Sequence, residues 1–179
     1  MSSVTTRTRQ SAEERREALI GAAIAEFARG GLHGTAVSSI TGRVGVTQPY
    51  AFSLFKTKKD LFLAAVERCY DLVEDAFRAA AESAAAEERV HAMGDAYAAL
   101  LGDRNKLLMQ HQAYAACDDP EIRAVVRRRY ARIYELVRQL TGADEEELTS
   151  FFATGMLMNV AAAIGMPELV PEEEWLEGG

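Results

Sequence analysis

The chain has 179 residues, a formal net charge of −7 and 49% hydrophobic residues, enough to bury a core in one unit or in a small domain joined to a larger one. Its two cysteines, Cys69 and Cys117, are far apart on helical patterns, which predicts buried thiols rather than a disulfide. No apolar run approaches the roughly 20 residues that span a bilayer. The arginines near the N-terminus are not followed by the apolar core of a secretory signal. We therefore expect a cytoplasmic protein without a membrane partner.

The charge is distributed unevenly along the chain. Residues 1–60 contain nine Lys/Arg and five Asp/Glu, a balance of +4, and residues 61–179 contain the remaining eleven and twenty-two, a balance of −11. A basic N-terminal segment followed by an acidic chain is expected when the N-terminal segment binds the phosphates of a nucleic acid. Abundant Ala, Leu, Glu and Arg, with only four prolines, favour an all-α fold.

The first helix is predicted to follow a polar segment, residues 1–10, which we interpret as a disordered arm. Arg7 and Arg9 in this arm either reach DNA, as the arms of other helix-turn-helix proteins do, or are simply solvated. Ser11 is predicted to cap the helix through a capping box, and Gly30-Gly31 to end it. Its buried positions are Ile20, Ala23, Ile24 and Phe27.

Two short helices joined by a glycine are predicted next. Thr35 is a candidate cap for the first of them, and its apolar spacings of three and four residues are helical. Gly45 permits a tight turn, and Thr47 can cap the second helix, with Pro49 in its first turn. This pattern is a helix-turn-helix, whose second helix would lie in the DNA major groove.

The second short helix contains the candidate base contacts. Ala51 and Phe55, four apart, are predicted to face inward. Gln can pair with adenine, Pro and Tyr can touch thymine methyl groups, and Tyr and Ser can bind phosphate. The lysines that follow predict a phosphate clamp. The candidate DNA-contacting residues are Ser38, Thr47, Gln48, Pro49, Tyr50, Ser53, Lys56, Lys58 and Lys59. Arg43 is equally compatible with DNA contact and with solvation.

A long helix is predicted from Thr57, which forms a capping pair with Asp60, to about Ser83. Its stripe is Phe62, Val66, Cys69, Val73 and Phe77. Four more helices are predicted after it: the first stops at Gly102, the second is capped by Asp103, the third runs from Asp118-Asp119-Pro120 to Gly142, and the fourth runs from Asp144 to Gly165.

A segment of the sequence is similar to that of a known family. The similarity rests on residues at characteristic positions: Gly34-Thr35, Val37, Ile40, Gly45-Val46, Phe55, the Lys56–Lys59 turn and Leu61-Phe62. This stretch resembles the DNA-binding segment of the tetracycline-repressor (TetR) family of bacterial regulators. The resemblance covers roughly the first 65 residues, and beyond them only the helical plan carries over. It implies a helix-turn-helix DNA-binding domain at residues 1–57, of three helices plus the arm, and a helical effector-binding and dimerisation domain at residues 58–179.

The sequence departs from the family pattern at two positions of the second short helix. Phe52 and Leu54 stand where the family usually carries Tyr and His that contact the DNA backbone. The phosphate contact of the first position is therefore in doubt, and Tyr50 is a candidate replacement. Both residues are compatible either with DNA contact or with packing in the core.

The resemblance also implies an effector pocket between the helices of the second domain. Soft, bulky and polar residues share one face of the middle helices and suit a small, partly apolar molecule, although each is also compatible with plain core. The candidate pocket residues are Met93, Tyr97, Met109, His111, Tyr114, Cys117, Phe152 and Met156.

Small residues at four-residue spacing in the last helix allow another helix to approach closely, which resembles the dimer interface of the family. The candidate interface residues are Ile133, Val137, Phe151, Gly155, Asn159, Ala162 and Ala163. A run of four arginines, Arg127, Arg128, Arg129 and Arg132, is compatible with a nucleic-acid patch. We favour pairing with the acidic residues 144–147.

No catalytic constellation and no Cys/His set at metal spacing is visible, so we expect neither an enzyme nor a bound metal or cofactor. The leading hypothesis is a homodimeric, ligand-responsive transcriptional regulator. Following the family, it would be a repressor that binds a palindromic double-stranded operator and is released by an unidentified small molecule. The alternative is a helical small-molecule-binding or adaptor protein without sequence-specific DNA binding.

Overall fold

The computed structural model describes residues 11–169, and every regular element in that range is helical. The all-α prediction is therefore confirmed. The α-helices are α1 (Ala12–Gly34), α2 (Val37–Val44), α3 (Gln48–Leu54), α4 (Lys58–Ser83), α5 (Arg89–Leu101), α6 (Arg104–Ala115), α7 (Pro120–Thr141) and α8 (Glu145–Ile164). Two single turns of 3-10 helix, η1 (Ala86–Glu88) and η2 (Pro167–Leu169), precede α5 and follow α8. The predicted arm with Arg7 and Arg9 lies outside the described residues.

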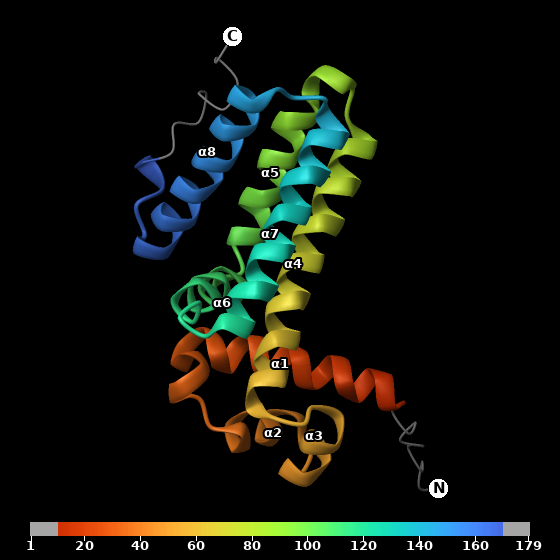
Figure 1. Ribbon diagram of the computed structural model, residues 1–179, viewed down its shortest axis with the longest axis vertical. Helices are drawn as coiled ribbons and strands as arrows, with labels where there is room; N and C mark the ends of the chain where they lie inside the picture. Colours follow the sequence, from red (N-terminus) through yellow and green to blue (C-terminus); the bar gives the residue numbers. More distant parts are fainter. Residues whose placement is uncertain (1–10, 170–179) are drawn as a thin grey trace, which may run out of the picture.

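The helices form two groups joined by α4 (Figure 1). We call α1, α2 and α3 the head, and α5 to α8 the body. The long helix α4 starts in the head and continues beside α5 and α7 into the body. Helix α6 lies where the two groups meet, and it makes its most extensive contact with α1 of the head. The head and body are therefore joined twice, through the chain by α4 and through packing by α6.

Side-chain caps set most of the helix starts, as the sequence predicts. Ser11, Thr57 and Asp144 each form a capping box with the residue three positions on, which satisfies two backbone N–H groups that the helix leaves free. Thr47 accepts from the Tyr50 backbone N–H, and Asp103 caps α6 in the same way. Each such cap contributes about 1 kcal/mol.

The predicted cap at Thr35 is wrong. The N-cap of α2 is Ala36, without a side-chain bond, whereas Thr35 is buried and its hydroxyl donates to the Glu26 carbonyl at 3.2 Å. The reason is the backbone of α1, which breaks its helical geometry at Gly31 (φ +61°) and then continues to Gly34. This break folds the link before α2 back onto α1, so Thr35 packs there and does not face the first turn of α2.

The apolar stripes predicted for the first and fourth helices form the main core. Phe27 of α1 and Phe62 of α4 are fully buried and meet edge to face with ring centroids 5.0 Å apart, a geometry that aromatic rings prefer. Burying a side chain of this size contributes roughly 1.5–3 kcal/mol. This pair fixes α1 to the start of α4 and so holds the head in place.

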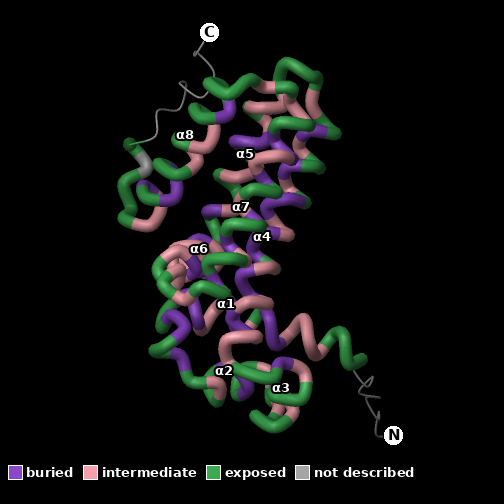
Figure 2. Tube along the Cα trace, viewed as in Figure 1, coloured by how far each residue is buried: buried purple, intermediate pink, exposed green. Residues whose placement is uncertain are grey.

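Helix α8 is an exception to the prediction that no segment is long and apolar enough to span a bilayer. Within residues 11–169 it is the one helix long and apolar enough to cross a membrane, with a mean hydropathy of 1.3 and 22% of the window buried. A single such helix is weak support for a membrane. Figure 2 shows much of its surface as exposed, and the exposed large apolar residues there are Met156, Leu157, Val160 and Ile164. An apolar helix face of this kind marks a contact surface.

Candidate nucleic-acid interface and effector pocket

The helix-turn-helix of the head presents the outer side of α3 to solvent. Gly45 takes a left-handed conformation (φ +70°) that ends α2 and makes the turn. Ala51 and Phe55 are buried, as predicted, and this orientation turns the opposite side of the helix outward. The exposed candidates for DNA contact are Ser38, Thr47, Gln48, Pro49, Ser53 and Lys56. They extend from α2 across α3 to the start of α4.

The two positions that depart from the family pattern have different environments. Phe52 is 41% exposed, and Leu54 is half-buried against the core. An exposed aromatic ring on the outer side of α3 can contact a thymine methyl group or the sugar of the backbone. Phe52 therefore joins the candidate DNA contacts, and Leu54 belongs to the packing of the head.

Two of the three lysines predicted to clamp phosphates are engaged inside the protein. The Lys58 ammonium donates to the carbonyl oxygens of His33 and Thr35 at 3.3 and 3.1 Å, at the C-terminal end of α1, where cations are favourable. Lys59 lies 2.5 Å from Glu121 and 3.3 Å from Asp119. Only Lys56 of the three remains exposed on the surface, so the clamp prediction needs revision at Lys58 and Lys59.

Arginines of the head hold α2 and α3 against α1. Arg43 of α2 forms an ion pair with Glu26 of α1 at 2.5 Å, which resolves its role in favour of packing between helices. The guanidinium of Arg15 lies over the ring of Tyr50, 5.7 Å from its centroid, and that of Arg16 lies over Phe55 at 5.2 Å. Such cation–π contacts contribute about 0.5–1 kcal/mol at exposed sites, and these two orient α3 on α1.

Lys59 joins the head to the body by an ion pair. Asp119 is the N-cap of α7 and Glu121 lies in its first turn, so Lys59 of α4 contacts the junction between α6 and α7. The hydrogen bond that the Lys59 ammonium donates to Glu121 is the main reason that the pKa of Lys59 is raised. The pKa of the Asp119 carboxyl is lowered although desolvation opposes the change, because backbone N–H groups and Lys59 bond to it.

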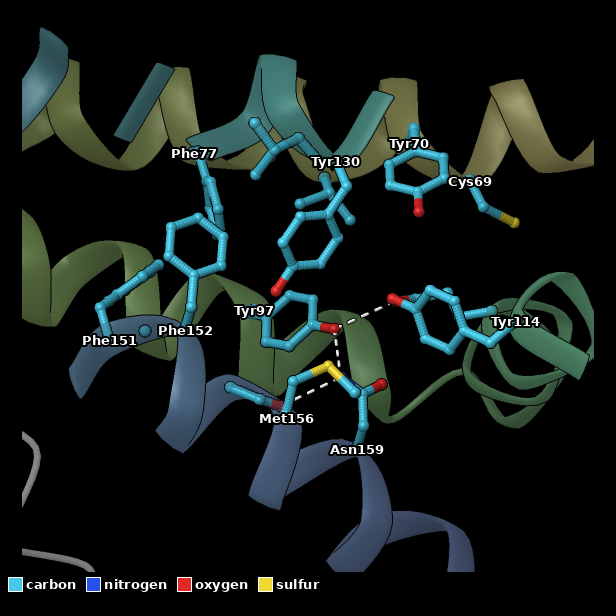
Figure 3. Close-up of a pocket in the computed structure, with 15 residues that line it drawn as sticks. Cys69, Tyr70, Phe77, Tyr97, Tyr114, Tyr130, Phe151, Phe152, Met156 and Asn159 are labelled. Atoms are coloured by element: carbon cyan, nitrogen blue, oxygen red, sulfur yellow. Dashed lines mark hydrogen bonds between the residues drawn. The ribbon is translucent and has the colours of Figure 1, made fainter. Parts of the chain in front are cut away.

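The body contains a largely apolar cavity among α4, α5, α6, α7 and α8 (Figure 3). Its volume is about 60 Å³, and seven of its fifteen lining residues are aromatic. Phe77 meets both Tyr97 and Phe151 edge to face, with centroids 6.1 and 5.7 Å apart. Among the described residues, no charged side chain lines the cavity. A site of this composition suits a small, mostly apolar molecule.

A short hydrogen-bonded chain crosses one wall of the cavity. The Asn159 amide nitrogen donates to the Tyr97 hydroxyl at 2.6 Å and to the Gly155 carbonyl at 3.0 Å. The Tyr97 hydroxyl in turn donates to Gln110 at 3.1 Å. These bonds connect α8 through α5 to α6, so a molecule that alters one of these helices affects the other two.

The tyrosine hydroxyls and the thiol around the cavity remain uncharged at neutral pH. Burial raises the pKa of the Cys69 thiol to about 12, and it also raises the pKa of Tyr70, Tyr97 and Tyr114 above their usual values. The common cause is desolvation, which disfavours the charged form. The cavity therefore disfavours charge on any group placed in it.

The structure brings together four of the eight residues predicted for the pocket. Tyr97, Tyr114, Phe152 and Met156 line the cavity, whereas the others do not. Met93 and Met109 are fully buried in the core of the chain. The His111 ring bonds to the Leu107 carbonyl within its own helix, and the Cys117 thiol donates to the Ala113 carbonyl. Helical periodicity places residues on a face but does not identify the helix that covers it.

Two tyrosines that line the cavity were not among the residues predicted for it. Tyr70 and Tyr130 belong to the buried sides of α4 and α7, and both line the cavity with their rings. A signal for them exists in the sequence, because a tyrosine on a buried stripe needs a partner for its hydroxyl. Three such tyrosines on separate helices, Tyr70, Tyr114 and Tyr130, indicate a shared space in which their hydroxyls meet.

The residues predicted for the dimer interface lie mostly inside the chain. Ile133, Val137 and Asn159 are 5%, 0% and 1% exposed, so they cannot touch a partner without rearrangement of the core. Phe151 and Gly155 line the cavity, and Ala162 and Ala163 pack on Leu101, Leu107 and Met158. The small residues of α8 thus allow close approach of helices from the same chain. The exposed stripe of α8 lies elsewhere, at Ala153, Leu157, Val160 and Ile164.

Three of the four arginines in the run on α7, Arg128, Arg129 and Arg132, pair with acidic residues of α4, not with residues 144–147. Arg128 contacts Glu67 at 2.5 Å, Arg129 contacts Asp71 and Glu74 at 2.5 and 2.8 Å, and Arg132 contacts Glu74 at 2.9 Å. Because Glu74 and Arg129 are buried, breaking the Arg129 contacts would leave an uncompensated charge in the interior. This network fixes α4 to α7 beside the cavity. Within residues 11–169, no group of His, Cys, Asp and Glu is placed to hold a metal ion.

Comparisons with known proteins agree with this geometry. Residues 19–65 match the family model described as bacterial regulatory proteins, tetR family; a comparison with curated protein sequences gave no match. A TetR-family transcriptional regulator from Streptomyces coelicolor is similar at 26% identity and a TM-score of 0.68, over 88% of both chains. A TetR-like transcriptional regulator from Rhodococcus sp. RHA1 is 17% identical with a TM-score of 0.70, over 91% of this chain and 90% of its own. The fatty acid degradation regulator FadR from Bacillus halodurans is 16% identical with a TM-score of 0.71, over 90% of this chain and 88% of its own.

The fold and the exposed α3 define a helix-turn-helix transcriptional regulator with a helical second domain. Residues 19–65 carry a TetR-type DNA-binding domain, and the chain shares the fold of solved TetR-like regulators. The predicted resemblance is therefore confirmed. The division of the chain at residue 57, and the individual contact residues, remain predictions.

Proposed function

We propose that this protein is a homodimeric repressor that binds a palindromic operator through α3 and is released when a small molecule occupies the cavity of the body. The observation that carries the proposal is the position of α6. Its residues Gln110 and Tyr114 line the cavity, and the same helix makes its main contact with α1 of the head. One rigid element therefore contacts both the pocket and the DNA-binding unit.

The contact between α6 and the head is close at one point. A Cβ atom at Gly31 of α1 would lie 2.6 Å from the Oε1 atom of Gln112. Gln112 is two residues from Gln110 and therefore lies on a different side of α6. Movement of α6 away from the cavity would press on α1 at this point and reorient α3. Helix α4 also lines the cavity and continues into the head, so it provides a second path for the same coupling.

A partner is needed because one recognition helix reads only half of a palindrome. The exposed stripe of α8 follows helical spacing, with Ala153, Leu157, Val160 and Ile164 on one side. Its apolar surface favours a second copy of the chain over solvent. We infer that two copies pack α8 against α8, with α7 beside it. In this arrangement the cavity and the dimer contact lie on opposite sides of the same helix, and the protein works in the cytoplasm.

Release of DNA requires that the ligand bind better to the conformation with poor operator affinity. A preference of about 1–3 kcal/mol changes operator occupancy roughly 5- to 150-fold. The similarity to the Bacillus halodurans fatty acid degradation regulator concerns the fold and does not identify the ligand. Among the described residues, the cavity wall has no cation that could pair with a fatty acid carboxylate.

Selection of random duplex DNA with the purified protein tests the DNA-binding half of the proposal. We expect a motif with two inverted half-sites. The variant Gln48→Ala should select a relaxed motif at one position of each half-site, because loss of a bidentate contact costs about 1–3 kcal/mol. Recovery of no motif with the wild-type chain would contradict the proposal. Identical motifs from both proteins would remove Gln48 from direct readout.

A further inference from the structure

The cavity has an unpaired hydrogen-bond acceptor at one wall. Both hydrogens of the Asn159 amide are used, one for the Tyr97 hydroxyl and one for the Gly155 carbonyl. A carbonyl oxygen can only accept, so the nitrogen must face Gly155 and the oxygen must occupy the other position. This oxygen, Oδ1, is buried and has no hydrogen-bond partner among the described residues. Asn159 as a whole is only 1% exposed.

A buried polar atom without a partner is destabilising, and such atoms are few in native proteins. In a cavity wall, the simplest explanation is that a bound molecule supplies the missing donor. An O–H or N–H group on the ligand would satisfy Asn159 Oδ1, whereas a ligand that carries only acceptors would not. The cavity therefore selects for a donor at this point.

A second polar atom lies on the opposite wall. Tyr70 comes from α4, and its buried hydroxyl makes no hydrogen bond of good geometry among residues 11–169, although the Tyr114 hydroxyl lies close enough to influence it. Figure 3 shows this hydroxyl directed away from α4 toward the interior. A hydroxyl can donate or accept, so Tyr70 tolerates a second polar group on the ligand without requiring one of a particular kind. The requirement for a hydrogen-bond donor on the ligand comes from Asn159 Oδ1.

The rest of the wall favours a neutral aromatic ring. Phe77 already pairs edge to face with both Tyr97 and Phe151, and another ring can extend this arrangement. No charged side chain lines the cavity among the described residues. The nearby arginine Arg129 lies over the Tyr70 ring, is ion-paired with Glu67, Asp71 and Glu74, and does not line the cavity, although its Nε has no hydrogen-bond partner among the described residues. A carboxylate or phosphate on the ligand would therefore be buried without a counter-charge, which is strongly unfavourable.

The size of the cavity limits the ligand further. Its volume of about 60 Å³ is smaller than an engineered cavity of about 150 Å³ that holds benzene. A ring can therefore enter only if part of the wall moves. Met156 on α8 lines the cavity and is 37% exposed, and its unbranched, flexible side chain can swing outward. The small volume favours a compact ligand of one or two rings over a larger one.

We propose that the cavity binds a neutral aromatic compound of one or two rings that carries an O–H or N–H donor, of the phenol or indole class, and that this donor bonds to Asn159 Oδ1. The proposal rests on the proposed function in treating this compound as the effector. The binding site itself follows from the cavity and from Asn159, so it can be tested without DNA.

Isothermal titration of the purified full chain with four matched probes tests the ligand class. The probes are 4-ethylphenol, its isostere 4-ethyltoluene, the anion 4-ethylbenzoate and the cation 4-ethylphenyltrimethylammonium. We expect the phenol to bind at least tenfold more tightly than each of the other three. Equal or tighter binding of the toluene would overturn the role of Asn159 Oδ1. Tightest binding of the anion or the cation would overturn the neutral class.

The variant Asn159→Leu should bind the phenol and the toluene with similar affinity, because it removes the acceptor. The same amide-to-Leu change at the exposed Gln139, outside the cavity, should leave the tenfold preference intact. If Asn159→Leu does not fold, the comparison of probes on the wild-type chain still decides the proposal. Absence of binding by 4-ethylphenol, indole and 2-naphthol alike would also overturn it.

The test separates the ligand class from the proposed function. Donor-selective binding with unchanged operator affinity would support the ligand class and contradict release of DNA by ligand. Specific operator binding together with no affinity for any aromatic donor would support the regulator and contradict the ligand class.

Discussion

Gln112 of α6 packs directly against Gly31 of α1, at the one point of that helix where the backbone has a positive φ, +61°. With ψ at −175°, this conformation is one that only glycine adopts readily. The contact joins the body to the DNA-binding head, so its loss affects both stability and communication.

The first prediction concerns this contact. Gly31→Ala should lower the free energy of unfolding by on the order of 1–3 kcal/mol, because the backbone is strained for alanine and the new Cβ meets Gln112. Urea denaturation followed by circular dichroism measures the change. Gly21→Ala on the same helix is the control, since no atom lies within 4 Å of the new Cβ; it should stabilise the protein by about 0.5–1 kcal/mol. Equal effects of the two substitutions would show that the contact is not tight.

The second prediction separates the lysines at the start of α4. Lys56→Ala should weaken binding to every DNA sequence and lower the magnitude of the salt slope by about 1, because an exposed lysine releases a counterion from the phosphate that it contacts. Lys59→Ala should leave the salt slope unchanged, because Lys59 is engaged with Asp119 and Glu121. Fluorescence anisotropy titrations at several salt concentrations measure both. A change of slope at Lys59 alone would reverse the assignment.

The lysines illustrate what the sequence could and could not predict. Helix starts were predictable because the cap and its partner are three residues apart, as at Thr57 and Asp60. The partners of Lys59, in contrast, are sixty and sixty-two positions away in the sequence. The charge run alone could not distinguish a phosphate contact from an ion pair between head and body.

The same limit applies to the last helix. The four-residue spacing of Gly155 and Asn159 correctly indicated close helix approach, but not whether the neighbour is in the same chain. Tyr97 of α5 occupies that space, 3.7 Å from a Cβ at Gly155. The exposed stripe of α8 is visible only once the packed side is known.

The third prediction tests the dimer. The double variant Leu157→Glu and Val160→Glu places charges on the exposed stripe of α8 and should give a folded monomer, because an interface cannot bury unpaired carboxylates cheaply. Sedimentation or light scattering measures the mass, and operator affinity should fall with it. Ala98→Glu, exposed on α5 outside this stripe, is the control and should remain dimeric. A dimeric double variant would place the interface elsewhere.

The fourth prediction concerns the cavity wall. Burial raises the pKa of Cys69 to about 12, so the thiol stays protonated as the pH rises and forms thiolate only as the pH approaches that value. Since the thiolate is the reactive form, native Cys69 should react with a thiol reagent at pH 8 far more slowly than in urea. Mass spectrometry of the labelled peptide measures this. Rapid labelling of Cys69 in the folded protein would contradict its position in the wall.

The central claim is that filling the cavity weakens operator binding, and Gly155→Met tests it without knowledge of the ligand. Gly155 lines the cavity beside Tyr97, 3.7 Å from a Cβ placed there, so a methionine side chain at this position would extend into the space of an effector. Ser150→Met, exposed one and a half turns earlier on α8, is the matched control.

The decisive measurement is the operator affinity of the three dimeric proteins by fluorescence anisotropy, with a duplex that the wild-type chain selects. The account predicts that Gly155→Met binds roughly 5- to 150-fold more weakly than the wild type, while Ser150→Met binds equally well. Unchanged affinity in a folded, dimeric Gly155→Met protein would contradict coupling between the cavity and the DNA-binding head.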